Sequence, residues 1–191
     1  MKTNEAVLGF NRFDTYKIIE HNKNLLVLLE CASAFAAGKN EPRHYLKAVL
    51  IRNVDTDCHI VAADGHKLAK IVIKDYQTDL PERLIVQSIK DAIKVKNFCM
   101  LSEDKESKDS QYPDYTRLMP AESETCEGLP VINASYLADM SAAYVRVLKK
   151  LYGCKFAGLK LKAINKDKGN LFGNDIAANV SIDFVIMPMR L

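Results

Sequence analysis

Two stretches of the chain carry the same order of predicted elements, and this repetition constrains the fold more than any other feature. In the first, apolar residues recur at helical spacing over Leu25–Phe35, and strand-like runs follow Pro42. In the second, helical spacing over Leu137–Leu151 is followed by alternating runs that end at Ile186. A helix followed by strands at both ends predicts an α+β fold, with antiparallel sheets on one side and helices on the other.

The first unit is predicted to contain one helix and a meander of strands. Asn22 can cap the helix and Gly38 is placed to end it, with a short strand before it around Tyr16–Glu20. Polar turns separate the three strand-like runs that follow, which are Tyr45–Arg52, Cys58–Ala63 and Lys67–Lys74.

The middle of the chain predicts a shortened copy of this unit. A helix begins at Ser88, between strand-like runs over Leu84–Val86 and Asn97–Leu101. Two polar stretches follow, Ser102–Ser110 and Ala121–Gly128, and we expect the first to be a mobile loop. We therefore divide the chain into a first unit over residues 1–120, with a shortened second half, and a C-terminal unit over 121–191. The two units are expected to pack as one domain.

The last unit repeats the order strand, helix, strands. A strand is expected over Gly128–Ile132, and Asn133 or Ser135 can cap the helix that Gly153 ends. Alternation over Leu159–Ala163 predicts the next strand, with a turn near Asp167–Gly169. The closing strand has one apolar face, made of Val180, Ile182, Phe184 and Ile186.

Composition excludes several classes of protein. Of the 191 residues, 48% are hydrophobic, which suffices for a sizeable core, and the net charge of +3 alone does not indicate nucleic acid binding. The five cysteines form no Cys-x-x-Cys pair, which favours reduced thiols over a zinc site or a disulfide framework. Glycine-rich phosphate loops are absent, and no apolar run approaches the roughly 18 residues of a membrane helix. We expect a soluble, cytoplasmic protein without metal or cofactor.

One short motif raises the question of catalysis. Asp64 and His66 flank Gly65, and aspartate with histidine suits general acid and base chemistry. Adjacent side chains in a tight turn point apart, however, and no nucleophile motif accompanies them. The favoured interpretation is a structural turn in which Gly65 takes a conformation that other residues resist.

Basic residues gather near two predicted helices, each opposite an apolar face. They are Lys90, Lys94 and Lys96 near the middle helix, and Arg146, Lys149 and Lys150 at the end of the last one. The first interpretation is an ordinary solvated helix surface. The second is a strip that neutralises phosphates without reading bases, which would make DNA binding salt-dependent and indifferent to sequence.

The chain ends on apolar residues instead of a polar tail. Met187–Leu191 follows a strand-like run, and two methionines beside a proline make an adaptable apolar patch. Termini normally fray unless something ties them down. The segment is therefore either a packed structural terminus or part of a binding site.

Four segments taken in order resemble one family. They are Arg43–Leu50 with the turn-containing run Val61–Ala69, then Tyr112–Pro120, Asn133–Leu137 and Met187–Leu191. The first is similar to the paired strands and Asp-Gly-His-Arg-Leu-Ala turn in the middle domain of the bacterial sliding clamp, the beta subunit of the replicative DNA polymerase. The others are similar to the clamp's linker between its last two domains, the start of its final helix and its carboxy terminus.

The resemblance implies a clamp-type fold and a cleft for the short clamp-binding peptides of polymerases and other replication and repair proteins. In the family these segments meet to form that cleft, and Leu68, Leu118 and Val185 would supply an apolar floor with the methionines. Carried over to this chain, the cleft residues are Gly65, His66, Lys67, Leu68, Pro113, Arg117, Leu118, Asn133, Tyr136, Val185, Met187, Pro188, Met189, Arg190 and Leu191.

The chain also departs from the family's pattern. A bacterial clamp has three domains of two units each, and we expect the amino-terminal domain, which closes the ring, to be missing. Ala63 stands for the usual threonine, Lys67 for the usual arginine, and His44 where an aromatic DNA contact is common. The sequence therefore leaves ring closure open, while it predicts the cleft.

The leading hypothesis is a non-catalytic DNA polymerase processivity factor, several copies of which surround duplex DNA while each tethers a polymerase. The predicted DNA contacts are Arg43, His44 and Tyr45 together with the six basic residues near the helices. The alternative is a stand-alone peptide-binding module that keeps the cleft without encircling DNA. An enzyme acting through Asp64 or His66 comes third.

Overall fold

Helices and strands follow one another largely in the predicted order. The computed structural model describes residues 16–19, 23–92, 99–104, 110–121, 131–154, 158–165 and 169–189. The elements are β1 (Tyr16–Ile19), α1 (Lys23–Ser33), η1 (His44–Lys47), β2 (Ala48–Val54), β3 (Asp57–Ala63), β4 (Lys67–Ile73), β5 (Arg83–Ile85), α2 (Val86–Ala92), β6 (Cys99–Ser102), η2 (Tyr115–Leu118), α3 (Ala134–Tyr152), β7 (Lys160–Asn165), β8 (Gly169–Ala177) and β9 (Val180–Ile186).

A seven-stranded sheet runs through both predicted units. Its order is β5-β2-β3-β4-β9-β8-β7, and every neighbouring pair is antiparallel. The two units join where β4 pairs with β9, from Lys67 opposite Ile186 to Ile73 opposite Val180. A separate pair, β1 and β6, lies beside the end of this sheet, where Leu84 bridges Glu103. One sheet therefore holds segments more than a hundred residues apart in sequence.

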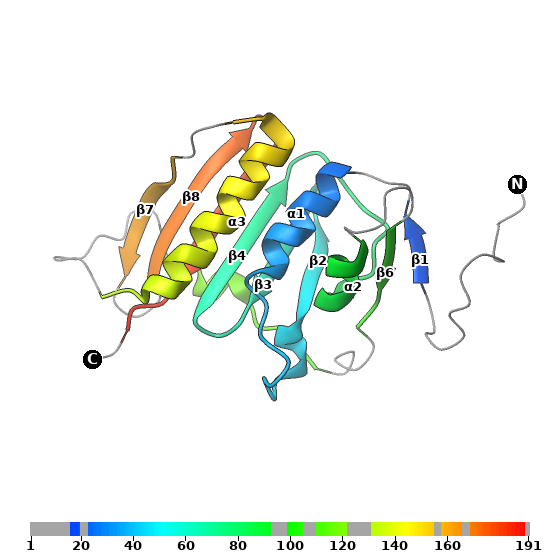
Figure 1. Cartoon of the computed structure of the whole chain (residues 1–191), viewed down its shortest axis with the longest axis horizontal. Helices are drawn as coiled ribbons and strands as arrows, with labels where there is room; N and C mark the ends of the chain where they lie inside the picture. The colour runs from blue at the N-terminus through cyan, green and yellow to red at the C-terminus, as the bar shows by residue number, and fades with distance from the viewer. Residues whose placement is uncertain are drawn as a thin grey trace, which may run out of the picture.

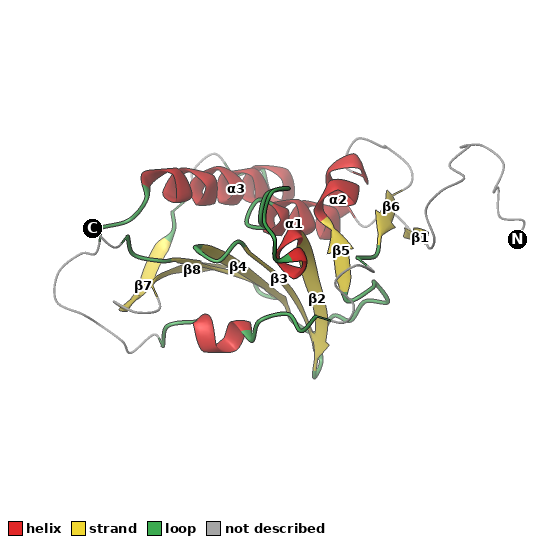
Figure 2. Ribbon diagram, turned by 90° about the horizontal axis from the view of Figure 1, so that it is seen from below, coloured by secondary structure: helices red, strands yellow, loops and turns green. Residues whose placement is uncertain are grey.

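The three α-helices of the described residues cover one face of the sheet (Figures 1 and 2). The helical spacing in α1 buries Leu25, Leu28, Leu29 and Ala32 against the strands. Phe35, just after α1, stacks on Phe184 of β9 with ring centroids 4.9 Å apart. Tyr144 of α3 meets the edge of the same Phe184 ring at 6.2 Å. This face holds the larger of two hydrophobic clusters.

The opposite face is covered more thinly. The segment around η2 crosses it, as Figure 2 shows on the side away from the helices. Tyr112 and Tyr115 of this segment are buried, and they belong to a smaller cluster with Leu46, Leu50, Val61, Ala63, Leu68, Ala163, Leu171 and Val185. β4 is the middle strand of the sheet, where both faces are covered. Six of its seven residues are therefore buried, instead of alternating between buried and exposed.

The structure confirms the α+β class with antiparallel strands and helices on one face. It also confirms the caps of α3: Asn133 is the N-cap, and Gly153 takes the left-handed conformation at φ +63°. β1 lies within the short strand predicted before the first helix. The division at residue 120 stays a prediction, and the sheet crosses it without a break.

Some details of the prediction differ from the structure. Gly38 does not end α1, because the helix stops at Ser33, whose hydroxyl donates to the carbonyl of Glu30. The run that begins at Tyr45 opens with a turn of 3-10 helix before it becomes β2. The strand predicted over Leu159–Ala163 is confirmed as β7, although Leu161 is 40% exposed on this edge strand.

β8 has no counterpart in the sequence prediction, although it pairs on both sides. Its sequence, GNLFGNDIA, contains glycines and asparagines that favour turns. Gly173 is required by close packing, because a Cβ there would lie 3.1 Å from the carbonyl oxygen of Ile182 and closer still to the side chains of Asp183 and Lys162. Asn22, residues 105–109 and residues 122–130 lie outside the described residues. In the described part of the chain, no helix is long and apolar enough to cross a membrane.

Candidate functional site

The turn between β3 and β4 is built by its own aspartate. One oxygen of Asp64 accepts from the backbone N–H groups of His66 and Lys67, at 2.8 and 2.9 Å. Gly65 has φ +95°, where a side chain would be strained, and a Cβ there would lie 3.0 Å from the guanidinium of Arg43. The Asp64 carboxylate therefore holds the turn together. Within the described residues no group of acidic, histidine or cysteine side chains could hold a metal ion.

The C-terminal tail is tied to this turn. The N–H of Met187 donates to the carbonyl of His66 at 2.9 Å, and the N–H of Met189 donates to the carbonyl of Val131 at 2.8 Å. Between them, Pro188 forms an antiparallel bridge with Ile132. These contacts fix the backbone up to Met189, whose side chain stays 45% exposed. Arg190 and Leu191 lie outside the described residues.

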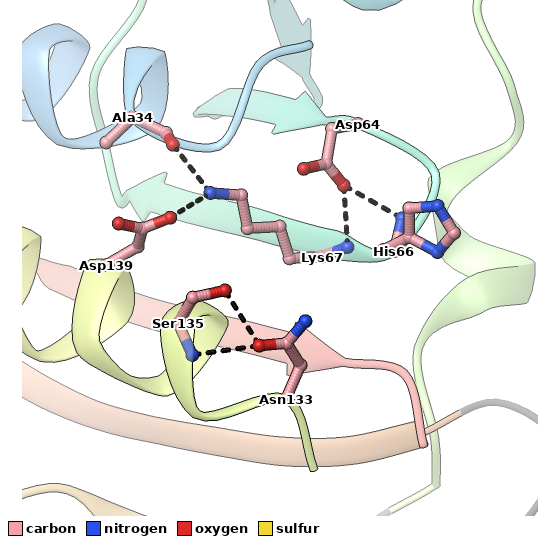
Figure 3. A network of polar contacts seen from close by, with 7 residues as sticks. All are labelled: Ala34, Asp64, His66, Lys67, Asn133, Ser135 and Asp139. Carbon is pink, nitrogen blue, oxygen red and sulfur yellow. Dashed lines mark hydrogen bonds and ion pairs between the residues drawn. The ribbon is translucent and has the colours of Figure 1, made fainter. Parts of the chain in front are cut away.

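The start of α3 lies beside the turn and the tail (Figure 3). The side-chain oxygen of Asn133 accepts from the backbone N–H and the hydroxyl of Ser135, at 2.9 and 2.7 Å, and caps the helix. One turn further on, the ring of Tyr136 stacks on the ring of His66, with centroids 6.0 Å apart and planes 16° apart. His66 is exposed and Tyr136 half-buried, so this stack is open to solvent on one side.

The linker predicted over Tyr112–Pro120 reaches the same region from the opposite face of the sheet. Asp114 caps η2 through Thr116 and pairs with the 85% exposed Arg117 at 3.0 Å. Leu118 packs, partly buried, on the cluster that contains Leu68 and Val185. Pro113 is half-buried.

The predicted floor residues lie side by side. Leu68 and Val185 are register partners in the β4–β9 pair, and they are only 4% and 2% exposed. The chain's own linker tyrosines pack on the same cluster. The side chains of these segments that stay exposed or partly exposed are those of His66, Tyr136, Leu118, Met187 and Met189.

Lys67 has a different orientation from its neighbours. Its ammonium lies on the helix side of the sheet, 2.5 Å from the carboxylate of Asp139 and 3.2 Å from the carbonyl of Ala34. Its side chain is only 8% exposed. Leu68, the next residue, points to the linker side because side chains alternate along a strand.

The predicted DNA contacts fall in two separate places. Arg43 lies over Gly65 and pairs with Glu41 at 2.6 Å, which lowers the pKa of Glu41 to about 2. Tyr45 meets the edge of the Tyr112 ring in the smaller cluster, and His44 opens η1 between them. These three residues lie near the turn and the linker, away from the basic residues of the helices.

On the helix side, two predicted DNA contacts are already paired. Glu30 of α1 accepts from Arg146 at 2.6 Å and from Lys150 at 2.7 Å, both on α3. Lys90 and Lys149 are exposed, whereas Lys94 and Lys96 lie outside the described residues. A groove of about 210 Å³ is lined by α1 and α3, and Glu30, Asp139 and Arg146 are among its lining residues.

Sequence reasoning missed three residues that shape these regions. Glu30 neutralises Arg146 and Lys150, Asp139 pairs with Lys67, and Nδ1 of His59 lies 2.8 Å from the Tyr115 hydroxyl. Each partner is more than fifty residues away in sequence. No local pattern could have paired them.

Comparison with known proteins is consistent with this geometry. No protein-family model matches the chain, and no curated protein does. Among solved structures, a DNA polymerase sliding clamp from Pseudomonas aeruginosa aligns with a TM-score of 0.62 and 15% identity, over 100% of this chain and 70% of that one. A clamp from Caulobacter crescentus aligns with a TM-score of 0.61 and 16% identity, over 97% and 68%.

A third similar structure is the DNA polymerase III subunit beta from Borrelia burgdorferi in complex with a natural product. It aligns with a TM-score of 0.62 and 13% identity, over 96% of this chain and 65% of that one. At such identities the likeness is one of fold and carries no residue roles by itself. The chain thus has the fold of the bacterial DNA polymerase sliding clamps, in a shortened form.

Proposed function

We propose that this chain is a sliding-clamp-like processivity factor, a non-catalytic accessory protein of a DNA polymerase in the cytoplasm. It tethers polymerase or repair proteins through a peptide-binding cleft and contacts duplex DNA without reading its sequence. One observation carries the proposal. The turn, the linker, the start of α3 and the tail, four segments spread over the chain, converge on one region within the clamp fold.

The region has the chemistry that a short apolar peptide needs. His66 and Tyr136 offer an aromatic surface, and Met189 offers an adaptable apolar one that is 45% exposed. The backbone N–H groups of Met187 and Met189 already donate hydrogen bonds within the chain. The rim of the candidate cleft, formed by the tail and the turn, is therefore held in place before a ligand arrives. A preformed rim reduces the ordering cost of binding.

The test is titration of a fluorescein-labelled peptide with leucine and phenylalanine anchors, followed by anisotropy. His66→Ala and Met189→Ala each remove an exposed contact and are expected to weaken binding by about tenfold, in the range of interface hot spots. Ile85→Ala is the matched control, because Ile85 is 39% exposed on β5, the edge strand three places from β4 in the sheet. Unchanged affinity in both rim variants would refute the cleft.

The second candidate is a peptide-binding module that never encircles DNA. The pairing of Glu30 with Arg146 and Lys150 favours it, because two of the basic groups on the helix side are neutralised within the chain. Light scattering coupled to gel filtration, with retention on nicked circular DNA, separates the two candidates. A monomer that binds the peptide but is not retained on circular DNA would support the module and exclude the ring.

A further inference from the structure

We propose that Lys67 and Asp139 form a positioning pair on the helix side of the turn, next to the cleft, and that Lys67 does not itself contact the peptide. The pair fixes Tyr136 and, through it, His66. This inference rests on the proposed function and assigns a role in it to Asp139, which no sequence pattern pointed to.

The position of Lys67 sets it apart from a binding residue. It is the first residue of β4, directly after His66, yet its side chain is only 8% exposed and enters the helix layer. Figure 3 shows its ammonium between Ala34 and Asp139, while the backbone N–H of Lys67 faces Asp64 at the turn. An ammonium enclosed in this way cannot reach a peptide on the outside of the turn.

The surroundings of the ammonium explain why it stays there. It donates to Asp139 of α3 at 2.5 Å and to the carbonyl of Ala34, after α1, at 3.2 Å. The rings of Phe35 and Tyr136 lie 5.5 and 5.6 Å away, within the range of cation–π attraction. A buried ammonium without such partners would be strongly disfavoured. Lys67 thus joins α1, β4 and α3 at one point.

The pair acts on the cleft through α3. Asp139 follows Tyr136 by three residues, so both lie on the same side of the helix. Holding Asp139 at Lys67 sets the rotation of this first turn, and with it the plane of the Tyr136 ring. That ring stacks on His66, whose carbonyl accepts from Met187 of the tail. A shift of α3 therefore moves the aromatic surface and the tail together.

The experiment is a double-mutant cycle on the full chain with the labelled peptide described above. Lys67→Met keeps the length of the side chain without its charge, and Asp139→Asn keeps the shape of its partner. Each is expected to weaken peptide binding by about tenfold, and the double variant no further than Lys67→Met, because both remove one interaction. Lys70→Met is the control, since Lys70 lies on β4 but is half-buried beside His59 instead of Asp139.

A second measurement separates positioning from a general loss of structure. In the free protein, backbone amide spectra of Asp139→Asn are expected to shift at His66, Tyr136 and Met187, while β2 and β3 keep their wild-type positions. Wild-type affinity in Asp139→Asn, additive effects in the double variant, or unshifted amides would each overturn the inference. A wild-type chain that binds no peptide would instead refute the proposed function, and the amide spectra would still decide whether the pair positions Tyr136.

Discussion

The two faces of the central sheet differ in how they are covered. α1, α2 and α3 close one face, and the side chains beneath them form the larger core around Phe35, Phe184 and Tyr144. Over the other face, the described residues place the linker with η2 and part of the η1 segment on a smaller core. The candidate cleft lies where this thinner cover meets the turn and the tail. Because its core is larger, we expect the closed face to contribute more to stability than the thinner face.

The faces also differ in what remains available on the outside. On the helix side, Glu30 forms ion pairs with Arg146 and Lys150, two of the basic residues that could contact phosphates. At the candidate cleft, Met189 and the His66–Tyr136 stack remain open to solvent. The proposed peptide binding therefore rests on exposed side chains, whereas the proposed DNA contact loses two of its basic groups to Glu30.

The largest expected effect tests the difference in stability between the faces. Phe184 and Val185 are neighbours on β9 that point to opposite faces and are fully buried. Phe184→Ala is expected to lower the free energy of unfolding by about 3–5 kcal/mol, because it leaves a cavity against Phe35 and Tyr144. Val185→Ala is expected to cost about 1–2 kcal/mol. Urea unfolding followed by circular dichroism measures both, and equal losses would show that the two cores contribute alike.

Cysteine labelling probes how tightly the helix face is closed. Cys31 and Cys58 are buried in the larger core, and burial raises the pKa of Cys31 to about 12 and that of Cys58 to about 11. Cys154 is exposed after α3. Iodoacetamide at pH 7.5 is expected to alkylate Cys154 at least about 100-fold faster than the two buried thiols, since only the thiolate reacts. Peptide mass spectrometry resolves each site, and comparable rates would mean that the helix layer opens readily.

The charge pairing above the helix face gives the next largest effect. Glu30→Gln frees Arg146 and Lys150, so duplex DNA affinity at low salt is expected to rise by about two- to tenfold, with a steeper salt dependence. Fluorescence anisotropy with a labelled duplex at several salt concentrations measures it. Glu82→Gln is the matched control, because it breaks an exposed pair with Arg52 of β2 that involves neither α1 nor α3. An unchanged salt slope would exclude this surface from DNA contact.

The difference between local apolar patterns and contacts between distant elements explains how much of the structure could be predicted from the sequence. Helical spacing and alternation predicted α1, β3, β4, α3 and β9, because each carries its own apolar pattern. β8 was not predicted, because Asn170 and Gly173 favour turns and are accommodated in this strand only through contacts with β9 and β7. The resemblance predicted which segments meet at the turn, since backbone pairing brings them there. It could not show that Lys67 turns inward to Asp139, or that Glu30 takes Arg146, because those pairs depend on a single side chain of a distant element.

The smallest effect concerns the thinly covered face. His59 of β3 is half-buried beneath the linker, with Nδ1 2.8 Å from the hydroxyl of Tyr115. Burial lowers the pKa of His59 from its ordinary value of 6.5, and the nearby Lys70 lowers it further, while Asp57 and Asp55 oppose both. The folded protein therefore favours neutral imidazole, and the unfolded chain takes up this proton more readily.

The sign of the pH dependence follows from this difference in proton binding. The stability contribution of His59 is fully present above pH 6.5 and is lost as the pH falls through 6.5 toward the lowered folded value. Between pH 7.5 and 5.5, the melting temperature of the wild type is expected to fall more than that of His59→Gln, which keeps an acceptor for Tyr115 without the titration. Differential scanning fluorimetry compares the two curves. The remaining histidines are the same in both proteins. Parallel curves would therefore mean that the linker does not shield His59 from solvent, even though Tyr115 lies over it.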